Sequence, residues 1–323
     1  MEKSTHKVEV VRVTLEPHPN ADSLSVVRVF GGYTVCVRTD DWTGIELGAY
    51  IPPDSIVDST RPEFGFLAGH ERIRVKRLRG VVSMGLLIPA PKGAQPGENV
   101  AEFLGVSHYE PPLPLNARGD EESAPPGFRP SYDVDSLRRF VHLFAEGEPV
   151  WITEKIHGAN ARFCHAEGRM RAGSRGTWKK HDKNNLWWRA LEDCPEIADF
   201  CERNPELTVY GEVYGSVQSL KYGAKPGEVR IAVFDILNCT DWVNAEAALD
   251  LAPELPWVPR VAANMPFDAD RVFALAEGAS LIPGADHLRE GIVVKPMEER
   301  TDLDIGRVCL KVVSNAFLEK DKG

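Results

Sequence analysis

The sequence contains no CxxC pair and no apolar run that approaches the roughly 20 residues needed for a membrane-spanning helix. Its six cysteines are scattered over 323 residues, which argues against a disulfide framework and against a zinc site. The N-terminus lacks the apolar core of a secretion signal. These absences together indicate a soluble, cytoplasmic protein whose thiols are reduced.

An excess of positive charge is also missing. The chain has 38 Lys and Arg residues against 48 Asp and Glu, and this net charge of −10 excludes a protein that coats nucleic acid non-specifically. The cations nevertheless concentrate in residues 72–79 and 169–189, so one face could still hold a polyanion. Within these two clusters the predicted nucleic-acid contacts are Arg72, Arg74, Lys76, Arg77, Lys179 and Lys180. The alternative is that both clusters are ordinary solvated charges of strands and loops.

The chain has no internal repeat, but its composition changes along its length. Residues 7–108 consist of short β-branched runs separated by Gly and Pro turn signals, which predicts a small barrel or sandwich. Apolar and basic side chains alternate in RIRVKRLR at residues 72–79, which predicts a strand with a basic face. Residues 111–131 are rich in Pro, Gly and charge, and we interpret them as a linker.

Residues 132–323 contain strand-like runs and helical segments that do not alternate regularly. This pattern favours an α+β fold with antiparallel sheets over a doubly wound parallel sheet. Apolar residues at 137, 140, 141 and 144 have helical spacing behind an acidic cap, which predicts a helix at the start of this domain. Further helices are predicted in residues 185–204, 245–252 and 268–278.

One lysine has an unusual setting. Lys155 ends the β-branched run of ITEK and directly precedes the small-residue turn at His157-Gly158, which would place its amine at the mouth of a site. A lysine is a nucleophile only when neutral, so it needs desolvation or nearby positive charge. An ordered series of further motifs follows it: GSR at 173–175, YGEVYG at 210–215, VFDI at 233–236, REGIVVK at 289–295 and LKVV at 310–313.

In this order the motifs resemble those of the covalent nucleotidyltransferases, the superfamily of ATP-dependent RNA ligases, DNA ligases and mRNA capping enzymes. The resemblance spans most of residues 150–315 and implies an ATP-grasp-like ligase core. It implies that Lys155 attacks the α-phosphorus of ATP and becomes lysyl-AMP. AMP then passes to a 5′-phosphate end, which is joined to a 3′-OH end. Mg²⁺ or Mn²⁺ is the metal expected beside the phosphates.

The same resemblance implies a role for each matched residue. Lys295 and Lys311 would contact the α-phosphate, complete the catalytic set with Lys155 and help to keep that lysine deprotonated. Glu290 would contact the metal or its water. The nucleotide-binding residues would be Glu154 at the adenine amino group, Arg175 and Glu212 at the ribose hydroxyls, and Phe234 stacked on the adenine.

Two residues depart from the superfamily pattern. His157 stands where an aspartate is usual, and a neutral imidazole cannot replace a carboxylate in holding metal-bound water. Cys309 stands at the first position of a motif that often carries two lysines, so Lys311 would act without that partner.

The arrangement of the modules resembles that of the Deinococcus-type RNA ligases. Few residues follow Lys311, so an additional module is expected before the catalytic domain, as an N-terminal OB-like β-barrel. The EPHPNADSL segment at residues 16–24 resembles a signature of tRNA-binding OB modules, although a plain loop would have a similar composition. The expected domains are an OB-like nucleic-acid-binding domain at 1–110, a linker at 111–131 and the nucleotidyltransferase domain at 132–323.

The expected function is therefore an RNA ligase that uses ATP and seals nicks or breaks in RNA or RNA/DNA duplexes. One alternative is a related enzyme, either a DNA ligase or a capping-type guanylyltransferase. The other is a non-catalytic RNA-binding protein with a decayed ligase core, which the changes at His157 and Cys309 would allow. The sequence leaves open whether the substrate is a nicked duplex, a single strand or a tRNA-like break.

Overall fold

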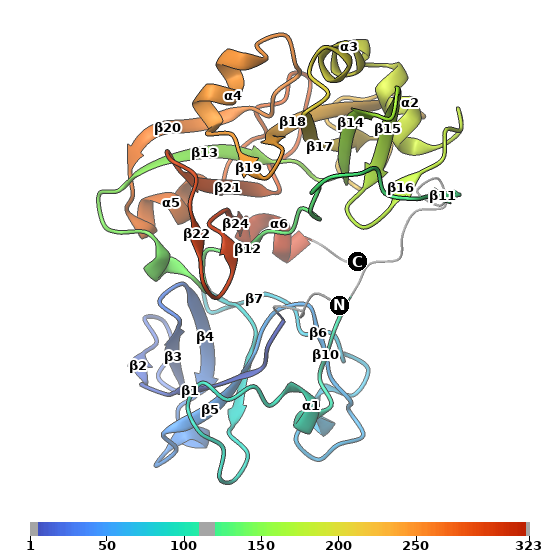
Figure 1. Cartoon of the computed structure of the whole chain (residues 1–323). Coiled ribbons are helices and arrows are strands. Elements are labelled where there is room, and N and C mark those ends of the chain that lie inside the picture. The colour runs from blue at the N-terminus through green and yellow to red at the C-terminus, as the bar shows by residue number, and fades with distance from the viewer. Residues whose placement is uncertain (1–5, 110–119, 321–323) are drawn as a thin grey trace. The chain divides into compact units, whose positions relative to one another are not determined.

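The computed structural model describes residues 6–109 and 120–320, which form two structural units (Figure 1). The first unit comprises residues 6–109 together with 137–141 and 315–320. The second comprises residues 120–136 and 142–314. In both ranges every helix is too short or too polar to cross a membrane.

The first unit is built from short antiparallel strands. Its sheets have the orders β1-β5-β9, β2-β3-β4, β10-β6 and β7-β8. The strands are β1 (Glu9–Arg12), β2 (Glu16–Pro17), β3 (Leu24–Val29), β4 (Tyr33–Arg38), β5 (Leu47–Ile51), β6 (Ser55–Ile56), β7 (Lys76–Leu78), β8 (Val81–Ser83), β9 (Leu86–Pro89) and β10 (Ser107–His108). The helices are α1 (Ala101–Leu104), α6 (Asn315–Lys320) and the 3₁₀ turns η1 (Asp40–Trp42) and η2 (Gly65–Leu67). Period-two alternation sends Val35 and Val37 of β4 into a core around Tyr50.

The strand predicted over residues 72–79 is shorter than expected. Only Lys76–Leu78 pairs with β8, because the backbone before it bonds elsewhere: the Ile73 amide donates to the Ser55 carbonyl, and the Ile73 carbonyl accepts from Asp54. The alternation holds only in the first part of the segment, where Ile73 and Val75 are buried and Arg72 and Arg74 are half-buried, and it breaks at Arg77, which is exposed like Lys76 before it.

The second unit contains two large sheets, and it confirms the predicted α+β class with antiparallel sheets. One sheet has the order β11-β16-β15-β14-β17-β18-β19 and the other β12-β24-β21-β13-β20, in which only the β12–β24 pair is parallel. The strands of the first sheet are β11 (Glu121–Glu122), β14 (Ala159–Ala166), β15 (Arg169–Ser174), β16 (Trp178–Lys179), β17 (Leu207–Gly215), β18 (Val229–Asn238) and β19 (Asp241–Trp242). Those of the second are β12 (Asp135–Ser136), β13 (Pro149–Lys155), β20 (Arg260–Pro266), β21 (Gly291–Pro296) and β24 (Leu310–Val313); β22 (Thr301–Asp302) and β23 (Gly306–Arg307) form a hairpin.

The helices of this unit are α2 (Leu186–Glu192), α3 (Pro195–Arg203), α4 (Ala245–Leu251), α5 (Ala269–Leu275) and the 3₁₀ turn η4 (Val141–Leu143), which borders it. The predicted segment 185–204 is two helices rather than one, because Pro195 has no amide hydrogen and instead starts α3. Trp187, Ile197 and Phe200 from α2 and α3 pack on the seven-stranded sheet in one apolar cluster.

The helix predicted at residues 137–144 is wrong, since only the short η4 turn forms there. Tertiary contacts outweigh the helical spacing at this point. Leu137 is fully buried, and the guanidinium of Arg138 donates to the Gly32 carbonyl and to Asn315. All four residues belong to the first unit.

Candidate active site

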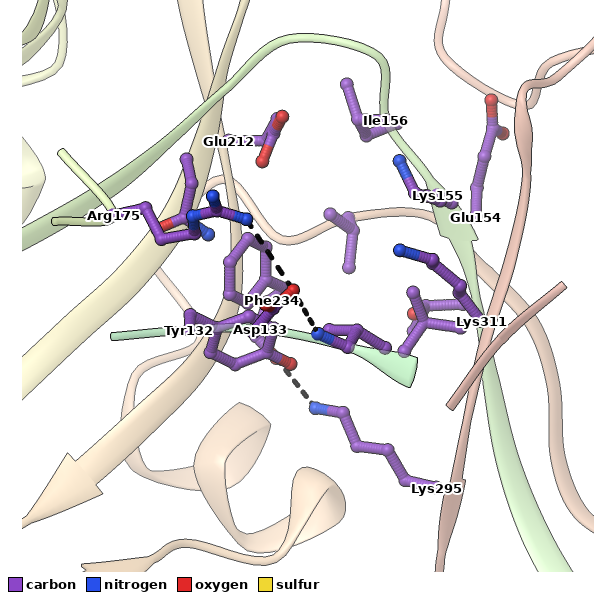
Figure 2. A pocket seen from close by; sticks show the side chains of 15 residues that line it. Tyr132, Asp133, Glu154, Lys155, Ile156, Arg175, Glu212, Phe234, Lys295 and Lys311 are labelled. Atoms are coloured by element: carbon purple, nitrogen blue, oxygen red, sulfur yellow. Dashed lines mark hydrogen bonds and ion pairs between the residues drawn. The ribbon is translucent and has the colours of Figure 1, made fainter. Parts of the chain in front are cut away.

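A cavity of about 170 Å³ lies in the second unit and takes side chains from both of its large sheets (Figure 2). It is lined by Tyr132, Asp133, Val134, Thr153, Glu154, Lys155, Ile156, Asn160, Arg175, Glu212, Phe234, Val258, Val293, Lys295 and Lys311. Every residue with a predicted nucleotide role therefore borders one cavity except Glu290. That residue reaches the site through its ion pair with Lys155.

Backbone register places the two central groups beside each other. Lys155 at the end of β13 pairs with Gly291 of β21, so Glu290 lies at the same edge, and the Lys155 Nζ donates to Glu290 Oε1 over 2.7 Å. A Cβ on Gly291 would lie 2.1 Å from the Val312 carbonyl oxygen, and one on Gly158 would lie 2.2 Å from that of Val213. Both positions require glycine because another strand passes there.

The nearest charges to Lys155 are carboxylates rather than cations. Burial by itself lowers the pKa of this lysine, but Glu290 and Glu212 oppose burial more strongly, so the pKa of Lys155 is raised. The resting site therefore holds an ammonium group. The charges of Lys155 and Lys311 repel each other, but in the resting site the two carboxylates outweigh this effect on Lys155.

Glu290 is buried and carries one oxygen that is not used. Burial raises the pKa of its carboxyl, but the neighbouring Lys155 and His157 outweigh burial and bring the pKa to about 2. Its Oε2 lies 3.6 Å from His157 Nδ1 and has no hydrogen-bond partner in the described part of the chain. Glu212 is half-buried, and desolvation raises its pKa to about 8.

Lys311 and Lys295 have different surroundings. Figure 2 shows the amines of Lys155 and Lys311 pointing into the cavity from the five-stranded sheet. Burial and the charge of Lys155 lower the pKa of Lys311. The Lys295 ammonium is only 2% exposed and instead contacts Asp235 Oδ1 at 2.5 Å and the Phe234 carbonyl at 3.1 Å.

Asp235 is the centre of a buried network that the sequence did not reveal. Besides Lys295, it accepts two hydrogen bonds of 2.9 Å from Arg307 and one of 2.5 Å from the Tyr132 hydroxyl. Burial acts to raise the pKa of Asp235, but the two cations outweigh it and hold the pKa at about 2. Cys309 is buried beside this network, with its Sγ 3.3 Å from the Tyr132 hydroxyl. The signal that could have revealed Arg307 is its position in the same RVCLK segment as Lys311.

The other side of the cavity is aromatic and apolar. The rings of Phe234 and Tyr132 lie 4.4 Å apart, and Ile156, Val258 and Val293 line the same space. Arg175 lies across the cavity from Lys311 and forms an ion pair of 3.6 Å with Asp133. Sequence reasoning also missed Asn160, whose Oδ1 is buried without a hydrogen-bond partner in the described residues.

Glu154 is held by a neighbouring loop. Its carboxylate is buried, and it accepts hydrogen bonds of 2.6 Å from both the Ser280 hydroxyl and the Leu281 amide. Consecutive strand residues point to opposite faces, and Figure 2 shows the Glu154 carboxylate directed away from the amines of Lys155 and Lys311.

The predicted nucleic-acid contacts are unequally available. In the second unit, Lys179 is buried and pairs with Glu121 at 3.3 Å, whereas Lys180 is exposed beside Asp120. In the first unit, Arg72 and Arg77 form ion pairs of 2.7 and 2.8 Å with Asp54 and Glu319. Arg74 is half-buried and Lys76 is exposed.

Comparisons with known proteins agree with this architecture. A family model described as RNA ligase matches residues 148–313, and an OB-fold domain model matches residues 7–90. No curated protein sequence matches the chain. Among solved structures, the chain resembles a Naegleria gruberi RNA ligase variant with ATP and Mn at 21% identity, with a TM-score of 0.83 and coverage of 98% of this chain and 99% of the other. A structure of the same ligase with PPi gives 23% identity, a TM-score of 0.83 and the same coverage.

At this level of identity the solved structures establish the fold, and they confirm the predicted order of an OB-like module and a nucleotidyltransferase core. The RNA ligase model extends over slightly more than half of the sequence and includes every motif from Lys155 to Lys311. The chain therefore belongs to the RNA ligase family.

Proposed function

We propose that this chain is an ATP-dependent RNA ligase that works through a lysyl-AMP intermediate at Lys155. The observation that carries the proposal is the composition of the cavity. Amines from Lys155 and Lys311 enter it on one side, and the Phe234 and Tyr132 rings border another. An aromatic surface suits a base, and half-buried cations suit phosphates. The Naegleria ligase structures with ATP or AMP and Mn support ATP as the nucleotide.

The chemistry requires Lys155 to lose a proton. Burial already favours the neutral amine, and the carboxylates of Glu290 and Glu212 are what oppose it. Any change that draws Glu290 away from the amine therefore favours the nucleophilic form. The amine nitrogen then bonds to the α-phosphorus of ATP as the bond to the pyrophosphate oxygen breaks. Lys311 and Arg175 would stabilise the charge that develops on the phosphate.

A divalent cation fits the carboxylate at Glu290. The buried Oε2 has no donor in the described residues, and a hard cation prefers such oxygen ligands. The described residues contain no cluster of three ligand side chains, so phosphate and water oxygens would complete the coordination. Mg²⁺ or Mn²⁺ bound there would supply positive charge beside the triphosphate.

Two further transfers complete the reaction. An oxygen of the RNA 5′-phosphate would attack the lysyl-bound phosphorus, which releases the Lys155 amine and leaves AMP on the RNA end. The 3′-OH would then attack the 5′-phosphate and release AMP. We propose RNA or RNA/DNA duplexes with these ends as substrates. We assign the nucleic-acid contact to residues 1–110, the linker to 111–131 and the chemistry to 132–323, supported by the positions of the two family matches.

The deciding experiment is an intact-mass measurement after incubation with ATP and Mg²⁺ or Mn²⁺. We expect a mass increase of one AMP that Lys155→Ala abolishes. An adduct with GTP in place of ATP would indicate a guanylyltransferase, and sealing of an all-DNA nick in preference to an RNA-terminated nick would indicate a DNA ligase. RNA binding without any adduct would show that the core is decayed.

A further inference from the structure

The turn that joins β7 to β8 is a strained, basic tip on the first unit. Its two central residues, Arg79 and Gly80, have positive φ angles of 47° and 91°. Two such residues in a row form the turn type that favours Asn-Gly, because asparagine and glycine tolerate the left-handed region. An arginine at the first position is therefore a strained choice, and such strain persists only where the surroundings enforce it.

The enforcing contacts come mainly from the loop between β2 and β3. The Asn20 side-chain amide donates to the Arg79 carbonyl over 2.9 Å. The His18 ring lies 3.1 Å from the Leu78 carbonyl through Nε2 and 3.1 Å from the Asn20 amide nitrogen through Nδ1. Because a carbonyl only accepts and an amide only donates, both bonds form in the neutral ring with its hydrogen on Nε2.

The hairpin adds a contact of its own, from the Arg77 guanidinium to the Gly80 carbonyl at 3.1 Å. Each of the three carbonyls from Leu78 to Gly80 thus accepts a side-chain hydrogen bond. The EPHPNADSL segment, which plays no part in the nucleotide cavity, has this clamp as its structural role.

The charges on this tip are available for an outside partner. Arg79 and Lys76 are exposed, and no acidic residue in the described ranges forms an ion pair with either. The neighbouring Arg72 and Arg77 are already paired, with Asp54 and Glu319. Arg79 on the fixed turn and Lys76 on the strand that leads to it, in a chain of net charge −10, suit the phosphates of a nucleic-acid backbone.

We propose that the β7–β8 tip contacts the RNA backbone through Arg79 and Lys76, and that His18 and Asn20 are positioning residues that hold it in its left-handed turn. The identity of the ligand rests on the proposed RNA ligase function. Because the two cations would contact phosphates and not bases, the tip contributes affinity and register, and it carries no preference for a base sequence.

The test uses the full chain and a fluorescently labelled nicked RNA duplex with 3′-OH and 5′-phosphate ends, whose binding is followed by anisotropy at several salt concentrations. Arg79→Gly removes both the strain and the charge. We expect an unfolding midpoint equal to or above that of the wild type, RNA binding about three- to tenfold weaker, and a salt slope smaller by about one. Arg79→Lys keeps the charge and should bind close to the wild type.

Asn20→Ala tests the clamp without changing charge, and it should weaken RNA binding while the rate of lysyl-AMP formation stays unchanged. Lys92→Ala removes an exposed charge elsewhere in the same unit and should leave binding unaltered. Wild-type binding by Arg79→Gly would overturn the contact. Wild-type binding by Asn20→Ala, beside weak binding by Arg79→Gly, would overturn the positioning role. Absence of lysyl-AMP in the wild type would instead refute the proposed function.

Discussion

Replacement of Asp235 by asparagine tests how strongly the buried network stabilises the second unit. Asp235 is 1% exposed and is the shared anion of Lys295 and Arg307. Its pKa of about 2, against an ordinary 3.8, corresponds to roughly 2 to 3 kcal/mol of folding free energy at neutral pH. Substitution also leaves the buried Lys295 without its counter-ion, which costs about 3–5 kcal/mol, whereas Arg307 keeps its ion pair with Glu299. We therefore expect Asp235→Asn to lose about 3–5 kcal/mol at neutral pH.

The sign of the pH dependence follows from the lowered pKa. The stabilisation from Asp235 is fully present above pH 3.8 and is lost as the pH falls towards 2. The difference between wild type and Asp235→Asn should therefore shrink in acid. Urea unfolding followed by tryptophan fluorescence measures it, since the ring of Trp242 lies 4.0 Å from the Arg307 guanidinium. Asp250→Asn, an exposed site in the same unit, is the control. A loss below about 1 kcal/mol at pH 7 would refute the reasoning.

Two further variants probe the cavity. Phe234→Ala should raise the ATP concentration for half-maximal lysyl-AMP formation about tenfold or more, because stacking on a base is worth about 1–3 kcal/mol. Phe234→Tyr keeps the ring and should stay near the wild type. Equal ATP dependence in all three proteins would exclude stacking. Gly158→Ala should slow lysyl-AMP formation at least about tenfold, because the new Cβ would lie 2.2 Å from the Val213 carbonyl oxygen and displace the turn that connects Lys155 to β14. Gly176→Ala, where a Cβ meets nothing within 4 Å, is its control, and equal rates in the two variants would contradict the steric argument.

The strand patterns were readable because they depend on local alternation. Among the strand-like runs of residues 132–323, LTVYGEVY at 207–214 and VRIAVFDIL at 229–237 form β17 and β18, since apolar and β-branched side chains fit a sheet wherever it lies. The helix predicted at residue 137 does not form, because Leu137 is fully buried and the adjacent Arg138 donates to the Gly32 carbonyl far away in the sequence. The break at Pro195 followed from a single residue's missing amide hydrogen, which was visible in the sequence.

The sequence by itself indicated which residues line the cavity and that the protein is a ligase. The motifs are identified by their residue types and by their order along the chain, and neither requires the distances between them. Only the tertiary structure decided how those residues are charged and directed. Lys155 and Glu290 are 135 residues apart, yet their contact raises the pKa of the lysine. The Lys295 ammonium pairs with Asp235, and the Glu154 carboxylate accepts hydrogen bonds from Ser280 and Leu281. Burial and pairing depend on segments that meet only in the folded chain, so no local pattern could have shown them.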